Sequence, residues 1–141
     1  MLFRSLVGQA KKLGLFAAGA ATQKYMQAIQ DQQEIMGAIA DMTIETYAME
    51  SAVLRAQKIV ETKGEAAAAL PVAMTRVYLS QAMEKVESAA RKVIAAVADG
   101  DMLRTQIAIL RRLAKHEPFN TVELRQQIAQ AVIERGKYTL G

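Results

Sequence analysis

The chain has 141 residues, of which 52% are hydrophobic and 23% are charged, and its formal net charge is +4. A chain of this size can bury a core of its own, and its composition excludes an intrinsically disordered protein. It contains no cysteine, which excludes disulfides, zinc–thiolate sites, cysteine-ligated iron–sulfur clusters and thiol nucleophiles. The lack of cysteine gives no direct signal of the compartment, and a reducing cytoplasm is the default expectation. Good helix formers dominate and there are only two prolines, so we expect an all-α protein.

A first helix is predicted over residues 2–29, because its apolar residues recur three and four positions apart. These residues are Phe3, Leu6, Ala10, Leu13, Ala17 and Ala20. The same segment is basic and free of acids, and its bases are Arg4, Lys11, Lys12 and Lys24. Such a helix can dock against an acidic neighbour or lie on an anionic membrane. Residues 13–21 loosely resemble the apolar region of a signal peptide, but Gly and Ala dominate them, which favours the helix.

A second helix is predicted over residues 31–62, where a heptad seam runs for about four heptads. The seam consists of Ile35, Ile39, Met42, Thr46, Met49, Val53, Ala56 and Val60. This segment is acidic overall, and Lys63 and Gly64 mark its end. A helix of this length measures about 48 Å, so we expect it to cross the whole bundle or to reach a partner.

Three further helices follow an Ala-rich link. Pro71 fits the first turn of the third helix, and Glu87 and Arg91 are spaced to pair on it. The seam of this helix consists of Leu79, Met83, Val86, Ala90, Val93 and Val97. Residues 99–101 break the pattern before a fourth helix over residues 102–115, with apolar positions at Leu103, Ile107, Leu110 and Ala114.

Pro118 stops the fourth helix, and Asn120 caps a fifth helix that ends at Arg135 and Gly136. Glu123 is placed as in a capping box. The links between helices are short, which is typical of antiparallel neighbours. We therefore expect residues 1–141 to form a single helical domain, an antiparallel bundle of four to five helices with one long central helix.

A search for chemistry predicts no catalytic, cofactor-binding or metal-ligating residue. The sole histidine, His116, has Leu113 three positions before it and therefore lacks the Glu-x-x-His context of diiron bundles. Carboxylates that could hold a metal occur on the second helix, at Glu34, Asp41 and Glu45, but a row of acids on one helix is usually solvated. No glycine-rich phosphate motif and no nucleophile elbow occur.

Nucleic acid is not an expected partner. The densest basic patch is formed by Arg111, Arg112, Lys115 and His116. It has neither a reading helix nor an aromatic platform beside it, and cations at a helix C-terminus are favoured by the helix dipole alone.

Residues 32–56 resemble the helix that opens the extra C-terminal domain of very-long-chain-type acyl-CoA dehydrogenases. The strongest part of the match consists of Ala40, Asp41, Tyr47, Ala48 and Met49. A later stretch is similar to bacterial members at Tyr78, Glu84, Ala89, Asp101, Leu103, Arg104, Leu110, Arg111, Pro118, Asn120, Thr121 and Tyr138. The resemblance covers nearly the whole chain.

Members of that family bind FAD and oxidise acyl-CoA thioesters at the α and β carbons. A glutamate takes the α proton, and an electron-transfer flavoprotein receives the electrons. The matched region follows their catalytic unit, and this sequence contains neither the glutamate motif nor the flavin-binding segments. The resemblance therefore implies FAD for the parent enzyme and no cofactor or catalysis for this chain alone.

On this resemblance, the chain is a structural or oligomerisation domain from the C-terminus of a larger flavoenzyme of fatty acid β-oxidation, and the native chain begins before Met1. Its partners would be the remaining domains of the parent and further copies in a homo-oligomer. The exposed seams of the first two helices would meet them. The alternative is a free-standing amphipathic helical protein, cytoplasmic or membrane-associated, that binds membrane or lipid-granule surfaces through residues 2–29.

Overall fold

The computed structural model describes residues 2–137, so Met1 and Tyr138 lie outside the described residues. Within this range every element of secondary structure is a helix, which confirms the expected all-α fold. The elements are α1 (Leu2–Tyr25), the 3₁₀ helix η1 (Met26–Asp31), α2 (Gln33–Lys63), α3 (Glu65–Val97), α4 (Gly100–Ala114) and α5 (Thr121–Arg135).

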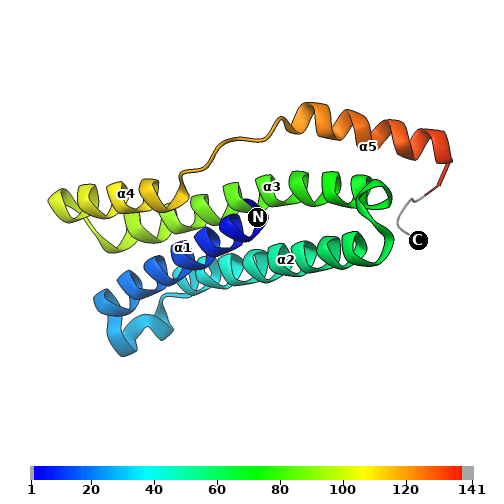
Figure 1. Cartoon of the computed structure of the whole chain (residues 1–141). Coiled ribbons are helices and arrows are strands. Elements are labelled where there is room, and N and C mark those ends of the chain that lie inside the picture. Colours follow the sequence, from blue (N-terminus) through cyan, green and yellow to red (C-terminus); the bar gives the residue numbers. More distant parts are fainter. Residues whose placement is uncertain (1, 138–141) are drawn as a thin grey trace.

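Three helices form the centre of the bundle (Figure 1). α2 and α3 run antiparallel as a long hairpin, and α1 packs against both of them. α4 turns back along one end of α3 and also contacts α1, whereas α5 lies along the other end of α3 (Figure 1). α2 is long, as expected, but α3 is the helix that contacts all the other described α-helices.

The predicted seams form the core. On α3, Leu79, Met83 and Val86 have no exposed surface, and on α2, Met42 and Met49 are at most 1% exposed. The core continues into α1 and α4 through Leu6, Ala10, Leu13, Ala17, Leu110 and Ala114. Burying one such leucine or methionine side chain contributes about 1.5–3 kcal/mol, so the heptad pattern supplies most of the driving force for the bundle.

The expectation that the seams of the first two helices face a partner is wrong. Leu6 and Leu13 on α1 are 1% exposed, and Met42 and Met49 on α2 are no more exposed than that. The two seams face each other and α3, because α1 lies in the angle between the helices of the hairpin. Both seams are therefore buried inside the bundle.

The Ala-rich link is helical, and the placement of Pro71 in a first turn is wrong. α3 begins at Glu65, so Pro71 lies inside the helix. Only Gly64 separates α2 from α3, with a φ of 85° that suits glycine. Residues 65–70 are strong helix formers, so their propensity prevails. Because Pro71 has no N–H, the carbonyl of Ala67 loses its usual partner, but Ala67 is exposed and its carbonyl can bond to water.

The first helix ends earlier than predicted. α1 stops at Tyr25, and residues 26–31 form the 3₁₀ helix η1. Met26 has a φ of 50°, which breaks the α-helical path and turns the chain toward α2. No glycine or proline marks this turn in the sequence, so periodicity alone extended the prediction through it.

The predicted ends of α5 are confirmed. The side-chain oxygen of Asn120 accepts a hydrogen bond from the backbone N–H of Glu123 at 3.1 Å. In return, the Glu123 carboxylate accepts a hydrogen bond from the side-chain amide of Asn120 at 3.3 Å. Gly136 closes the helix with a φ of 65°, and its N–H donates to the carbonyl of Val132 at 2.9 Å. α4 starts at Gly100, two residues before its predicted start at residue 102. It ends at Ala114, one residue before its predicted end at residue 115.

Candidate functional site

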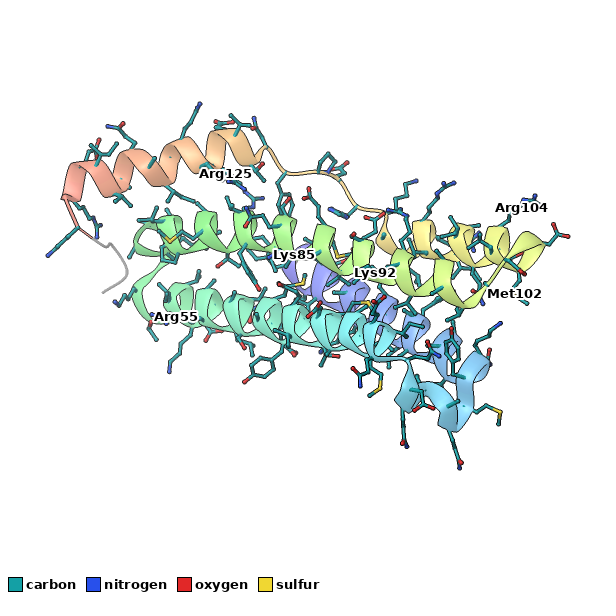
Figure 2. All side chains as sticks on the ribbon, turned by 180° about the vertical axis from the view of Figure 1, so that it is seen from behind. Arg55, Lys85, Lys92, Met102, Arg104 and Arg125 are labelled. Atoms are coloured by element: carbon teal, nitrogen blue, oxygen red, sulfur yellow. The ribbon has the colours of Figure 1, made fainter. Side chains whose placement is uncertain are left out.

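An open groove of about 680 Å³ lies between α2 and α3. Figure 2 shows two of its lysines, Lys85 and Lys92, following each other along α3. The groove is lined by Asp41, Ile44, Glu45, Gln81, Glu84, Lys85, Ser88, Ala89 and Lys92. Its wall thus carries three carboxylates and two ammonium groups, and it contains neither a histidine nor a cysteine.

Glu45 links the two helices of the hairpin at the edge of this groove. The Tyr78 hydroxyl donates a hydrogen bond to Glu45 Oε2 at 2.9 Å, and Lys85 Nζ lies 3.6 Å from Glu45 Oε1. Burial raises the pKa of Tyr78 to about 12, with further contributions from the hydrogen bond to Glu45 and from its charge. Tyr78 therefore stays protonated at neutral pH and acts as a donor between α2 and α3, not as a base.

The groove does not fit a flavin dinucleotide. A pyrophosphate is usually held by backbone N–H groups at a helix N-terminus or by converging cations. Here Asp41, Glu45 and Glu84 surround the two lysines, and their negative charge would repel phosphate. The expectation that the chain holds no cofactor-binding residue stays a prediction.

The acids weighed as metal ligands do not converge. Glu45 already receives Tyr78 and Lys85, and both Asp41 and Glu34 are exposed. Across residues 2–137, no three side chains of the metal-ligating types gather closely enough to hold an ion.

α1 docks on the acidic helix, which confirms one of the two interpretations of its charge. Lys11 Nζ lies 3.0 Å from Glu50 Oε1, and Arg4 donates a hydrogen bond to the side chain of Gln57 at 3.2 Å. The apolar face that a membrane would need is instead in the core, since Leu6 and Leu13 are 1% exposed. Among the described helices, none is at once long enough and apolar enough to cross a bilayer.

Arg76 occupies a position that the sequence did not single out. Its guanidinium carbon lies 5.8 Å from the ring centre of Phe3 and 5.5 Å from that of Phe119. Arg76 thereby joins the start of α1, the body of α3 and the segment before α5 by cation–π contact. Its Nε is buried without a hydrogen-bond partner. Phe3 and Phe119 are far from Arg76 in the sequence, so no local sequence pattern predicts this contact.

Of the basic patch at the end of α4, Arg111, Arg112 and Lys115 are exposed and His116 is half-buried. Gln9 on α1 donates from its side-chain amide to the carbonyls of Leu113 and Lys115, at 3.0 and 2.6 Å. His116 Nδ1 lies 2.9 Å from the carbonyl of Ala114. Gln9 and His116 thus contact carbonyls at the end of α4, and Gln9 also connects this end to α1.

The family model described as "Acyl-CoA dehydrogenase, C-terminal domain" matches residues 9–112. The chain belongs to this family. The match covers most of α1 and of α4 and all of α2 and α3, and the resemblance noted in the sequence is confirmed.

Two bacterial relatives extend this finding. A probable acyl-CoA dehydrogenase of Bacillus subtilis (strain 168) is 40% identical over 135 residues, which are 96% of this chain and 23% of that protein. The crystal structure of an acyl-CoA dehydrogenase complexed with FAD, from Bacillus anthracis, superposes with a TM-score of 0.96 at 41% identity. That match covers 99% of this chain and 24% of the other. The chain spans about a quarter of the length of these relatives.

Proposed function

We propose that this chain is the C-terminal helical domain of a longer, FAD-dependent acyl-CoA dehydrogenase, and that it serves the enzyme by packing and oligomerisation. The observation that carries the proposal is the TM-score of 0.96 over 99% of the chain to about a quarter of a flavin-bound enzyme. In this proposal the remaining domains hold FAD and acyl-CoA, the whole enzyme acts in fatty acid β-oxidation in the cytoplasm, and this chain alone catalyses nothing.

The polar contacts of the described residues support a structural role. The pairs Lys11–Glu50 and Tyr78–Glu45 each join two helices, and Arg76 joins three segments. These contacts connect the helices of the module to one another. A helical module connected in this way is suited to supporting the domains of its own chain and to meeting a second subunit.

The alternative of a free-standing protein on membrane or lipid-granule surfaces has less support. It requires the apolar side of residues 2–29 to face lipid. In the bundle this side packs against α2 and α3, and Ala10, Leu13 and Ala17 are at most 1% exposed. A lipid-bound state would therefore cost the protein its core.

The proposal is tested by measuring the intact mass of the native product in the source cells, detected with an antibody to this segment. We expect a polypeptide about four times the length of this chain, as in the relatives. A native product of 15.4 kDa would overturn the proposal. We also expect the isolated chain to be colourless after purification. Flavin that copurifies with it in stoichiometric amount, detected by its absorbance, would contradict the assignment of FAD to the other domains.

A further inference from the structure

The side of α2 that points away from the core is also apolar. Residues spaced three and four apart share one face of a helix, and on α2 such a set lies opposite the buried seam. We call this set the outer face of α2, and it consists of Met36, Ala40, Ile44, Tyr47, Ser51 and Leu54. Its large side chains are well exposed, with Tyr47 at 73%, Ile44 at 64%, Leu54 at 56% and Met36 at 45%.

The nearest charges lie on the flanks of this face. Glu50 is on the side toward α1, where it pairs with Lys11 at 3.0 Å. Asp41 is on the opposite side, where it lines the groove against α3. Charge returns to the outer side of α2 at Arg55, which Figure 2 shows near the turn into α3. From Met36 to Leu54, the outer face thus runs for about 27 Å without an ionised group.

The other helices also expose apolar side chains, with Leu15 on α1, Met102 and Ile109 on α4, and Val122 and Ile133 on α5, but there they are mixed with charged ones. α3 exposes Glu84, Lys85 and Lys92, and α4 exposes Arg104, Arg111 and Arg112. α1 exposes Lys11 and Lys12. A solvated helix normally carries such charges on its outer side. α2 is therefore apolar on two opposite sides, which is typical of a helix that is buried on both.

The size of the face decides between possible occupants. A strip about 27 Å long and about 10 Å wide covers roughly 300 Å², the lower end of the ~300–600 Å² of the largest apolar patch on a typical monomer, and such patches are often functional. The strip falls well short of the ~800 Å² per partner that a stable contact between free proteins needs. A partner in the same polypeptide needs less area, because tethering raises its effective concentration to the millimolar range.

We propose that the outer face of α2 docks on an uncharged apolar surface of the remaining part of the same acyl-CoA dehydrogenase polypeptide. The inference rests on the proposed function, since it needs the longer chain that the relatives possess. The relatives supply the tethered polypeptide, because this chain spans 23% and 24% of their lengths. α2 then has the core of this module on one side and the rest of the parent enzyme on the other.

The experiment measures how fast a thiol on this face reacts with a maleimide, in the isolated chain and in the native-length polypeptide. The chain has no cysteine, so Tyr47→Cys introduces a single reporter. Ser88→Cys is the matched control, because Ser88 is exposed on α3 at the charged groove. Mass spectrometry of the labelled peptide separates the reporter from cysteines elsewhere in the longer polypeptide.

We expect the thiol at position 47 to react at least about tenfold more slowly in the native-length polypeptide than in the isolated chain, because thiol labelling requires exposure. The thiol at position 88 should react at similar rates in both. Equal rates at position 47 in a native-length enzyme would overturn the docking inference and leave the proposed function standing. Protection in the isolated chain that grows with its concentration would identify a second copy as the occupant and also overturn it. A native product that is no longer than the present chain of 141 residues would overturn both proposals.

Discussion

α3 and α5 are both regular helices, but they are stabilised in different ways. α3 contacts every other described α-helix and buries Leu79, Met83 and Val86 completely. α5 packs against α3 alone among the described elements and has no buried residue, and Ile133 on it is 73% exposed. An isolated helix of this length is marginal in water. The comparison indicates that α3 is stabilised by the core and that α5 depends on its caps and on the contacts of its half-buried residues with α3.

The largest difference is expected when a core residue of α3 is truncated. Leu79→Ala should lower the free energy of unfolding by about 2–5 kcal/mol, because it leaves a cavity where the side chain has no exposed surface. Ile133→Ala on α5 is the control, and it should change stability by no more than about 0.5 kcal/mol. Urea unfolding followed by circular dichroism measures both. Similar losses from the two variants would show that α5 belongs to the same cooperative core.

The contact that links the two regions should have an intermediate effect. Arg76→Ala removes the guanidinium between Phe3 and Phe119 and should cost about 1–2 kcal/mol. Arg76→Lys keeps the charge but loses the flat surface that stacks on the rings, so we expect it to restore only part of the loss. Thermal unfolding compares the three proteins. An unchanged melting temperature in Arg76→Ala would mean that this contact does not stabilise the junction.

A smaller and local effect is expected at the start of α5. Asn120→Ala removes the acceptor for the N–H of Glu123 and should destabilise α5 by ~1 kcal/mol. Asn120→Asp retains the capping oxygen and serves as the control. Hydrogen exchange should become faster in the amides of α5 while those of α3 stay protected. Faster exchange in both helices to the same extent would contradict the independence of α5.

An effect of similar size concerns the hairpin that supports α5. Tyr78→Phe removes the hydrogen bond to Glu45 and should cost about 0.5–1.5 kcal/mol at neutral pH. The pKa of Tyr78 is about 12 in the folded protein, above the usual value of about 10, so the folded state holds its proton more tightly.

The contribution of Tyr78 is therefore complete below pH ~10 and is lost as the pH rises toward ~12. The difference in unfolding free energy between the wild type and Tyr78→Phe should shrink over that range. Equilibrium unfolding at a series of alkaline pH values measures it, and a difference that stays constant through pH ~12 would refute the assignment.

Much of the fold was predictable because its signals are local. The seam of α3 from Leu79 to Val97 is buried as predicted, and the paired Glu87 and Arg91 meet at 3.0 Å. The cap at Asn120 also formed as expected. Two helix boundaries were predicted wrongly. Pro71 suggested the start of a helix, although it lies inside a strongly helix-forming segment. No residue type at Met26 indicated the turn that ends α1.

The candidate surfaces were less predictable than the helices. A periodic pattern shows that Tyr47 and Met49 lie on different sides of a helix, but it does not say which side the neighbours cover. The expected partner surface was therefore assigned to the seams, whereas the structure leaves the outer face of α2 exposed. The contact of Arg76 with two distant rings is equally non-local.

The sequence by itself determined that the chain is helical, where most of its helices run, which residues enter the core and which family it resembles. These properties follow from helix propensity, capping and apolar spacing, all of which act between residues a few positions apart. Only the tertiary structure decided that α1 uses its bases to dock on α2, that α3 is the helix shared by all the others, and that α2 has a second apolar side left open. These outcomes depend on which faces meet in space, and that choice is made by the packing of the whole bundle.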